Sequence, residues 1–433
     1  MGLRSVVKQL IPRGLFRRIE PTGHLLEAFI WNVRYGFPGR GLKVIGITGT
    51  NGKTSTAFMV HRMLQDAGYK TALMTTVAWG VGDDIKSQIH HYTNVPVPEL
   101  MQRLKVVRAA NVDYMVMEIT SQALAQNRAW GVPFSVAVLT NLTHEHLDYH
   151  GTFERYRDAK RKLFKRANKN RRGLRVGIVN ADDPSAEYFA RDVKNPVSYG
   201  LKDADIVAQD VELTPNFVKY TAVADGQHYD IVCHLPGSFN VSNSLACLGV
   251  GRALGLTKDQ IEHGIAALEG VEGRMTNIDE GQNFSVIVDY AHTPDSFEKL
   301  FRDIKPVVKG KLIVMFGSAG RRDEAKRSVQ GRLAGEYADE VVITEEDDRD
   351  IDGVQIMNEI AAGAEQAGKT RERNLFLVHD RTEAINFTLK RAKKDDTVLL
   401  LGKGHEKTIE RANGENPWDE IGTTHEVLRN LKK

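Results

Sequence analysis

A glycine-rich segment offers the clearest chemistry in this sequence. Residues 46–54 read Gly-Ile-Thr-Gly-Thr-Asn-Gly-Lys-Thr and lie between a short apolar run and a stretch with helical spacing. In such a turn, backbone N–H groups and the N-terminus of the following helix form a site for nucleotide phosphates. We expect Lys53 to reach the terminal phosphates and the Thr54 hydroxyl to bind Mg2+. The residues predicted to contact the nucleotide here are Gly49, Thr50, Asn51, Gly52, Lys53, Thr54 and Ser55.

A second candidate site is the histidine-rich segment 141–150. Its histidines, His144, His146 and His150, are spaced closely enough to converge on one metal ion. Imidazole is a frequent zinc ligand, whereas magnesium prefers oxygen ligands. The spacing alone leaves a zinc site and a magnesium site open.

The elements that must position these residues follow one repeated pattern. Short apolar runs, turns and helical segments alternate from residue 43 onward, which predicts a parallel α/β sheet. Between residues 197 and 235 the helical spacing gives way to short β-type runs, which indicates a small antiparallel extension. We predict strands at residues 43–48, 114–119, 136–141, 175–180, 285–289, 311–316, 340–344, 374–378 and 397–401, and helices at 54–66 and 240–254.

A second α/β series begins near residue 273, so we predict a domain boundary close to residue 270. Residues 43–270 are expected to form a P-loop ATPase domain, and residues 271–433 a Rossmann-like α/β domain. Residues 1–42 precede the first predicted strand and are expected to form a short separate segment.

The composition fits a globular protein of two or three domains, since 41% of its 433 residues are hydrophobic and 27% are charged. A net charge of +3 gives no indication of nucleic-acid binding. The two cysteines are too few for a disulfide framework, so we expect a cytoplasmic protein. No apolar run is long enough to span a membrane. The basic segment 1–18 is expected either to dock on its own protein or to lie on an anionic membrane surface.

Three motifs resemble those of the Mur ligases, and the first is shared with folylpolyglutamate synthases. They are Thr-Gly-Thr-Asn-Gly-Lys-Thr at 48–54, Met-Glu-Ile-Thr-Ser at 117–121 and Asn-Leu-Thr-His-Glu-His-Leu-Asp-Tyr-His at 141–150. The resemblance implies a ligase that uses ATP and Mg2+ to activate a carboxylate as an acyl phosphate and then forms an amide bond. It also implies that Thr54, Glu118 and His146 bind the metal.

Segment 156–164, Tyr-Arg-Asp-Ala-Lys-Arg-Lys-Leu-Phe, follows at the spacing where the family carries a carbamylated lysine. The resemblance implies that Lys160 bears a carbamate derived from CO2 and contributes to the metal site. Lys53, His146 and the modified Lys160 are then the expected catalytic residues. Without the flanking motifs, Lys160 would be interpreted as a solvated charge on a basic helix.

Three later segments resemble the remaining nucleotide motifs of the family: Gly-Ser-Phe-Asn-Val-Ser-Asn-Ser at 237–244, Gly-Arg-Met at 273–275 and Asp-Tyr-Ala-His-Thr-Pro-Asp at 289–295. The resemblance implies that both domains contact the nucleotide, and therefore that one domain closes on the other. The residues implied are Asn240, Asn243, Arg274, Asp289 and His292.

Within the family, the sequence is most similar to the ligases that add the third residue of the peptidoglycan stem peptide. This resemblance implies a UDP-linked muropeptide and an amino acid as substrates, with the short segment 1–42 in place of the usual UDP-binding domain; we expect a monomer. The residues implied to hold the muropeptide are Thr93, Asn94, Thr120, Ser121, Gln126 and Arg128. Those implied to line the amino-acid pocket are Arg322, Asp347, Asp348, Arg349, Gly402 and Glu406.

The incoming amino acid is predicted from residues 346–349, Glu-Asp-Asp-Arg. Arg349 could pair in bidentate fashion with the distal carboxylate of meso-diaminopimelate. The carboxylates beside it would also suit the ammonium group of L-lysine, and we favour meso-diaminopimelate. Two alternatives stay open: a folylpolyglutamate- or cyanophycin-type ligase, and a nucleotide-binding subunit without catalytic activity.

Overall fold

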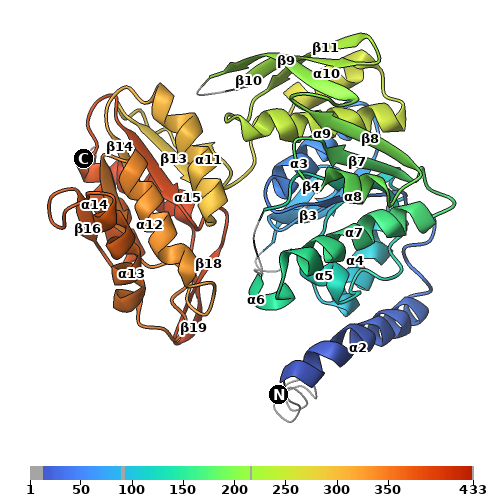
Figure 1. The fold of residues 1–433 in the computed structure, drawn as a ribbon, viewed down its shortest axis with the longest axis horizontal. Coiled ribbons are helices and arrows are strands. Elements are labelled where there is room, and N and C mark those ends of the chain that lie inside the picture. Colours follow the sequence, from blue (N-terminus) through green and yellow to red (C-terminus); the bar gives the residue numbers. More distant parts are fainter. Residues whose placement is uncertain (1–12, 89–92, 144, 146, 215–216, 432–433) are drawn as a thin grey trace.

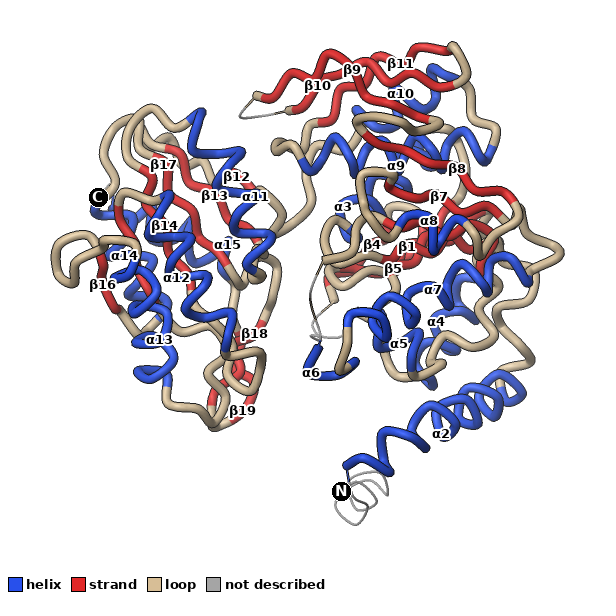
Figure 2. The backbone as a smooth tube through the Cα atoms, in the orientation of Figure 1, coloured by secondary structure: helices blue, strands red, loops and turns tan. Residues whose placement is uncertain are grey.

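The chain folds around two separate β-sheets (Figure 1). The computed structural model describes residues 13–88, 93–143, 145, 147–214 and 217–431. In Figure 2 each sheet is flanked by helices, and we call the two parts the first body and the second body. Within the described residues, no helix combines the length and the apolar content needed to cross a bilayer.

The first sheet is parallel in its middle and antiparallel at both ends. Its strands, in spatial order, are β11 (Gln227–Cys233), β10 (Val218–Ala224), β9 (Ile206–Leu213), β8 (Asn195–Gly200), β7 (Val176–Asn180), β6 (Phe134–Leu139), β1 (Val44–Thr48), β5 (Tyr114–Glu118), β2 (Thr71–Met74), β3 (Ala78–Val81) and β4 (Asp84–Ser87). In this spatial order, every pair of neighbouring strands between β9 and β2 is parallel. It is antiparallel in β9–β11 and in β2–β4. The predicted α/β class, with a mostly parallel sheet and an antiparallel extension, is confirmed.

Helices cover both faces of the first sheet because its central strands are apolar on both sides. Ile45 and Ile47 of β1 belong to the apolar cluster under α3, α9 and α10, whereas Val44 belongs to the cluster under α4 and α7. The helices of the first body are α2 (Arg13–Arg34), α3 (Lys53–Asp66), α4 (Val97–Ala109), α5 (Ser121–Ala125), α6 (Leu147–His150), α7 (Phe153–Lys169), α8 (Ala186–Ala190), α9 (Phe239–Leu254) and α10 (Lys258–Ala266).

The second body repeats the α/β arrangement on a smaller scale. Its sheet has the order β12 (Thr276–Asn277), β13 (Ser285–Asp289), β17 (Thr397–Leu401), β14 (Leu312–Phe316), β15 (Glu340–Ile343) and β16 (Leu375–Leu377), with only β12 antiparallel to its neighbour. Its helices are α11 (Pro294–Ile304), the 3-10 helix η1 (Lys305–Val307), α12 (Ala325–Tyr337), α13 (Gly353–Gln366), α14 (Arg381–Arg391) and α15 (Glu420–Leu431), and a hairpin of β18 (Thr408–Arg411) and β19 (Gly414–Pro417) completes it.

A buried ion pair joins α14 to α15. Arg381 donates from Nε and Nη2 to the two carboxylate oxygens of Glu420, at 2.8 and 2.7 Å, and neither side chain is exposed. An Arg381→Met substitution would leave a buried carboxylate without its cation, so we expect the second body to lose about 3–5 kcal/mol of unfolding free energy. Urea unfolding followed by tryptophan fluorescence would measure this, because Trp418 donates to the same carboxylate at 2.8 Å.

Arg302→Met is the matched control for Arg381→Met. Arg302 pairs with Glu298 on the surface, where its side chain is 66% exposed. Exposed pairs contribute at most about 1 kcal/mol. If both variants lose the same small amount of unfolding free energy, the Arg381–Glu420 pair does not stabilise the second body.

Candidate active site

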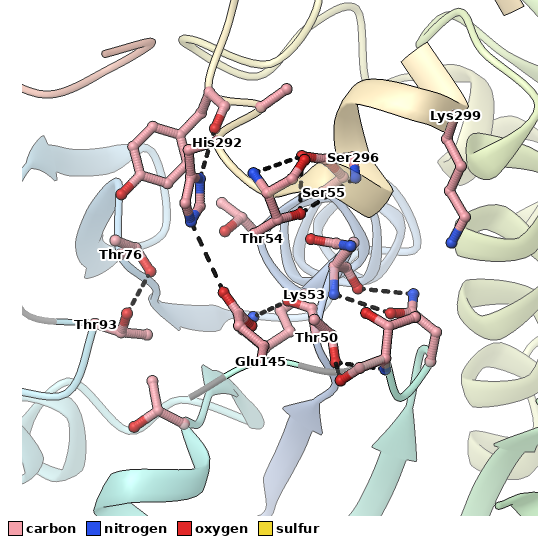
Figure 3. Close-up of a pocket in the computed structure, with 18 of the residues that line it drawn as sticks. Thr50, Lys53, Thr54, Ser55, Thr76, Thr93, Glu145, His292, Ser296 and Lys299 are labelled. Carbon is pink, nitrogen blue, oxygen red and sulfur yellow. Dashed lines mark hydrogen bonds and ion pairs between the residues drawn. The ribbon is translucent and has the colours of Figure 1, made fainter. Parts of the chain in front are cut away.

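A cavity of about 1520 Å3 lies between the two bodies and is lined by residues of both. Its walls come from the loops that follow β1, β5, β6 and β13, at the carboxyl ends of the parallel strands, where α/β folds usually bind ligands. Figure 3 shows part of the lining, with Lys53 and Thr54 on one side and His292 and Ser296 on the other. Segments more than 200 residues apart in sequence therefore meet at one site.

The glycine loop is held in shape by the loop that follows β6. Thr50 N donates to the Asn141 carbonyl at 2.9 Å, and Asn51 N donates to the Asn141 side-chain oxygen at 2.9 Å. Gly52 adopts φ +80, and a Cβ there would lie 2.2 Å from Oδ1 of Asn243. Glycine is therefore required at residue 52 on steric and conformational grounds. Lys53, the first residue of α3, donates from Nζ to the Thr50 carbonyl at 2.7 Å.

Glu118, at the end of β5, is the centre of a buried oxygen cluster. Its Oε2 accepts from the Thr54 hydroxyl at 3.0 Å and from both the backbone N–H and the hydroxyl of Thr76 at 3.1 Å. Its Oε1 lies 4.0 Å from Nζ of Lys53. Carboxylate and hydroxyl oxygens beside a phosphate loop are the donors that Mg2+ prefers. Thr54 and Glu118 therefore fit the predicted magnesium site.

Lys160 of α7 is buried behind the glycine loop. Thr152 caps this helix by accepting from Arg155 N at 3.3 Å, and its buried face carries Lys160 toward β1. The Lys160 Nζ donates to the Gly49 carbonyl at 2.6 Å, and the residue is 2% exposed. Burial, followed by the nearby Lys53 ammonium, holds the pKa of Lys160 well below its usual range. The structure thus places a buried amine directly behind the phosphate loop.

The second body contributes Arg274, Asp289 and His292 to the cavity. The Arg274 guanidinium lies 3.4 Å from the Thr54 hydroxyl, and the His292 Nε2 lies 3.9 Å from Glu145 (Figure 3). Burial lowers the pKa of His292 to about 4, so this imidazole is neutral at pH 7 and its contact with Glu145 is not an ion pair. Asp289 accepts from Met275 N at 2.8 Å and from Ala291 N at 2.7 Å. It thereby fixes the backbone of the loop before β12 and of the loop after β13.

The predicted muropeptide residues form a hydrogen-bonded group around Asn94. The Asn94 side chain donates to the Glu118 carbonyl at 2.8 Å and accepts from Thr120 N and from the Thr120 hydroxyl at 2.8 and 2.9 Å. Arg128 donates to the Asn94 carbonyl at 2.8 Å. The Thr93 and Thr76 hydroxyl oxygens lie 2.8 Å apart, which links this group to the oxygen cluster. Gln126 also lines the cavity.

The part of the cavity lining that surrounds Arg349 is rich in carboxylates. Arg349 donates from Nε to Glu410 at 2.6 Å and lies 3.9 Å from Asp347. Lys403 is fully buried and contacts Asp347 at 2.9 Å and Glu406 at 2.5 Å. Burial alone would lower the pKa of Lys403, but these two carboxylates raise it, so the ammonium stays charged. Arg322 also lines the cavity.

Some predicted residues stand outside the cavity lining. Gly49 and Lys160 lie behind the glycine loop, and Ser121 faces His150 at 3.0 Å. Asp348 points away and pairs with His379 at 2.9 Å. A Cβ on Gly402 would lie 2.7 Å from the Glu346 carboxylate, so that glycine allows a close approach. His146 and His144 lie outside the described residues.

The sequence alone gave no reason to select several residues that shape this site. Thr76 holds Glu118, Asn141 holds the glycine loop, and Asp295 accepts from the Asn51 side chain at 2.7 Å across the two bodies. The amide of Asn141 was visible within the histidine-rich motif, but Thr76 lies in a turn without a distinctive pattern. Asn240 and Asn243, predicted near the nucleotide, do line the cavity, and Asn243 donates to Asn240 at 2.9 Å.

Known proteins resemble the chain over most of its length. The model of the Mur ligase middle domain matches residues 47–251, and that of the Mur ligase glutamate ligase domain matches residues 273–404. The UDP-N-acetylmuramyl-tripeptide synthetase of Roseiflexus sp. (strain RS-1) is 41% identical over 412 residues, which cover 92% of this chain and 80% of that protein. The UDP-N-acetylmuramoyl-L-alanyl-D-glutamate--2,6-diaminopimelate ligase of Geobacillus thermodenitrificans (strain NG80-2) is 36% identical over 393 residues, covering 90% and 79%. A solved structure of a ligase of the latter name matches with a TM-score of 0.62 at 27% identity, covering 90% of this chain and 79% of that one.

This chain belongs to the Mur ligase family, and it is an ATP-dependent ligase of the ADP-forming type. The expectation drawn from the motifs is thereby confirmed for the family and the enzyme class. The match also favours a Mur ligase over a folylpolyglutamate-type ligase or a subunit without activity. The roles of the individual residues stay predictions, which the geometry of the cavity supports.

Proposed function

We propose that this ligase adds a diamino acid, preferably meso-diaminopimelate, to UDP-N-acetylmuramoyl-L-alanyl-D-glutamate during peptidoglycan synthesis. The observation that carries the proposal is a cavity whose lining includes both a phosphate loop from the first body and a mixed cationic and acidic group around Arg349 from the second. The name of the Geobacillus relative contains both substrates, and the name of the Roseiflexus relative, a UDP-N-acetylmuramyl-tripeptide synthetase, is consistent with the same step.

In the proposed reaction, a carboxylate oxygen of the muropeptide attacks the γ-phosphorus of ATP and ADP leaves. The amine of the incoming amino acid then attacks the acyl carbon, loses a proton and displaces inorganic phosphate. Lys53 and Arg274 face the loop where charge develops on the transferred phosphoryl group, and they would stabilise it. Mg2+ bound by Thr54 and Glu118 would supply further charge neutralisation.

We further propose that Lys160 carries a carbamate. The neutral amine would attack CO2, forming a new N–C bond as one C=O π bond opens, and would lose a proton, which turns a buried neutral amine into an anion near Lys53. A buried ammonium is costly unless it is paired. Lys160 donates to a backbone carbonyl, and burial and then the Lys53 cation lower its pKa, whereas Glu145 and Glu118 raise it. A negative group at this position would balance the local charge and lie close to the magnesium site.

The choice between diaminopimelate and lysine depends on Arg349. Its guanidinium is already paired with Glu410, so a distal carboxylate would have to exchange with that side chain. Diaminopimelate can make this exchange and can also offer its distal ammonium to Glu406 or Asp347, whereas lysine offers the ammonium alone. We therefore propose diaminopimelate as the better substrate.

The test measures phosphate release from ATP with UDP-N-acetylmuramoyl-L-alanyl-D-glutamate and either amino acid, with the product identified by mass spectrometry. We expect a diaminopimelate-containing tripeptide. We also expect Arg349→Met to raise KM for diaminopimelate by roughly tenfold to a hundredfold, the loss of about 1.5–3 kcal/mol typical of a charged hydrogen bond. A lysine product that is insensitive to this substitution would overturn the amino-acid assignment, and no product with either would overturn the muropeptide assignment.

We propose that the enzyme acts as a monomer in the cytosol. A single chain supplies residues to both walls of the cavity, which supports a monomer. ATP and UDP-linked precursors are cytosolic metabolites, which supports this location.

A further inference from the structure

One helix of the first body is only half covered by the protein. Helix α2 packs beside α4 at the margin of this body, away from the second body (Figures 1 and 2). Its inward side carries His24, Ala28 and Asn32, which are buried at 8%, 0% and 1% exposure. Asn32 fixes the packing by donating to the Trp130 carbonyl at 3.2 Å. The helix is therefore anchored along one side.

The opposite side of α2 exposes a continuous apolar stripe. Leu26 lies three or four residues before Phe29 and Ile30, and Val33 lies three or four residues after them, so the four share one side of the helix; they are 60%, 48%, 52% and 52% exposed in chain order. The other large apolar side chains exposed in the described residues are scattered, which is normal for a protein surface. Beside the stripe, Phe29 contacts the Trp130 ring with centroids 5.8 Å apart. A stripe of this kind indicates a surface that meets an apolar medium.

The net charge of the N-terminal part of the chain indicates which kind of apolar surface the stripe meets. Residues 1–43 contain eight Lys or Arg and two Asp or Glu, a net charge of +6, so the rest of the chain, with 51 basic and 54 acidic residues, has a net charge of −3. The basic residues of segment 1–43 are Arg4, Lys8, Arg13, Arg17, Arg18, Arg34, Arg40 and Lys43. A second copy of the same helix would bring two such cationic segments together, which is unfavourable. An anionic surface would be attracted to them.

We propose that α2 docks this protein on an anionic membrane surface. The helix lies in the lipid headgroup region with its apolar stripe inserted. Its inward side, which carries His24, Ala28 and Asn32, stays packed on the first body. This geometry is that of an interfacial amphipathic helix and not of a spanning one, which agrees with the lack of any described helix able to cross a bilayer. The proposal concerns a surface remote from the cavity and does not depend on which amino acid is ligated.

The experiment is co-sedimentation of the full chain with phosphatidylglycerol–phosphatidylcholine vesicles and with phosphatidylcholine vesicles alone, at low and high salt. We expect binding to the anionic vesicles that weakens with salt and is much weaker on neutral ones. Each basic residue near the surface contributes roughly fivefold to partitioning, so Arg17→Gln with Arg18→Gln should weaken binding by at least about tenfold.

Phe29→Glu with Ile30→Glu tests the stripe, and Val354→Glu is the matched control. Val354 is equally exposed, at 54%, but lies on the second body. The stripe variant should lose vesicle binding with an unchanged circular dichroism spectrum, and the control should bind like the unmodified protein. The proposal is overturned if the unmodified chain does not sediment with anionic vesicles. It is also overturned if light scattering shows that the stripe variant converts a dimer to a monomer without a change in vesicle binding.

Discussion

Lys53→Ala should lower the ligase kcat by about a thousandfold while the protein stays folded. The Lys53 Nζ lies at the N-terminus of α3, within 2.7 Å of the Thr50 carbonyl and 4.0 Å from Glu118. When phosphates enter the loop, the ammonium is expected to exchange its contact with the carbonyl for phosphate oxygens. Removal of one preorganised donor in an enclosed site typically costs 10²–10³-fold in rate, and this donor also carries a full charge.

The measurement is steady-state phosphate release at saturating ATP, alongside thermal unfolding of each variant. Lys86→Ala is a suitable control, since Lys86 is 67% exposed in β4 and pairs with the surface residue Asp84. The Lys86 variant should keep nearly full activity. If the Lys53 variant retains more than about a tenth of the activity, the glycine loop does not bind the transferred phosphate in the way proposed.

The buried strands were the most predictable part of the fold, for a physical reason. Strands that are covered on both faces are apolar without interruption, and β13 (Ser285–Asp289) and β17 (Thr397–Leu401) coincide with the predicted ranges. The short edge strand β4 (Asp84–Ser87) is mostly polar and exposed, with Ile85 as its one half-buried apolar residue, so it has no run of apolar residues to detect. Its position is set by the β3 hairpin partner and not by its own composition.

The region 197–235 was predicted as antiparallel, and the structure refines that prediction. β9, β10 and β11 pair antiparallel, but β8 continues the parallel sheet beside β7. The orientation of β8 is set by the connection through α8 (Ala186–Ala190), which places a crossover between the two strands. The residue pattern of a single strand does not contain this information.

The site was predictable where a local motif contains the chemistry, and not where two distant segments meet. The glycine loop and Glu118 could be identified from neighbouring residues, whereas the Asn51–Asp295 contact links positions 244 residues apart. The resemblance implied that Asp348 lines the amino-acid pocket, but the cavity lining does not include it. It pairs with His379 because Gly353, where a Cβ would lie 2.2 Å from both side chains, leaves room for them. Its neighbour Asp347 does face the cavity.

Lys160→Ala should also abolish most of the activity, by roughly a hundredfold to a thousandfold, the range expected for a lost electrostatic group in an enclosed site. Lys160 is 2% exposed and is held against the Gly49 carbonyl. If the functional form is the carbamate, alanine removes an anion that balances Lys53, and arginine or glutamine cannot replace it. The loss should therefore appear in kcat and not in the stability of the fold, because deletion of a buried amine removes a desolvation cost.

A spectroscopic signal distinguishes the carbamate from a plain structural lysine. Carbon-13 NMR after incubation with labelled bicarbonate should give a carbamate resonance in the unmodified protein and none in Lys160→Ala. Lys165→Ala is the matched control five residues further along α7, since Lys165 is 50% exposed and lies 4.0 Å from Asp192. It should retain both the resonance and the activity. A resonance that survives in Lys160→Ala would place the modification elsewhere, and an inactive Lys160→Ala beside an unmodified protein without the resonance would make Lys160 a positioning residue for the Gly49 backbone.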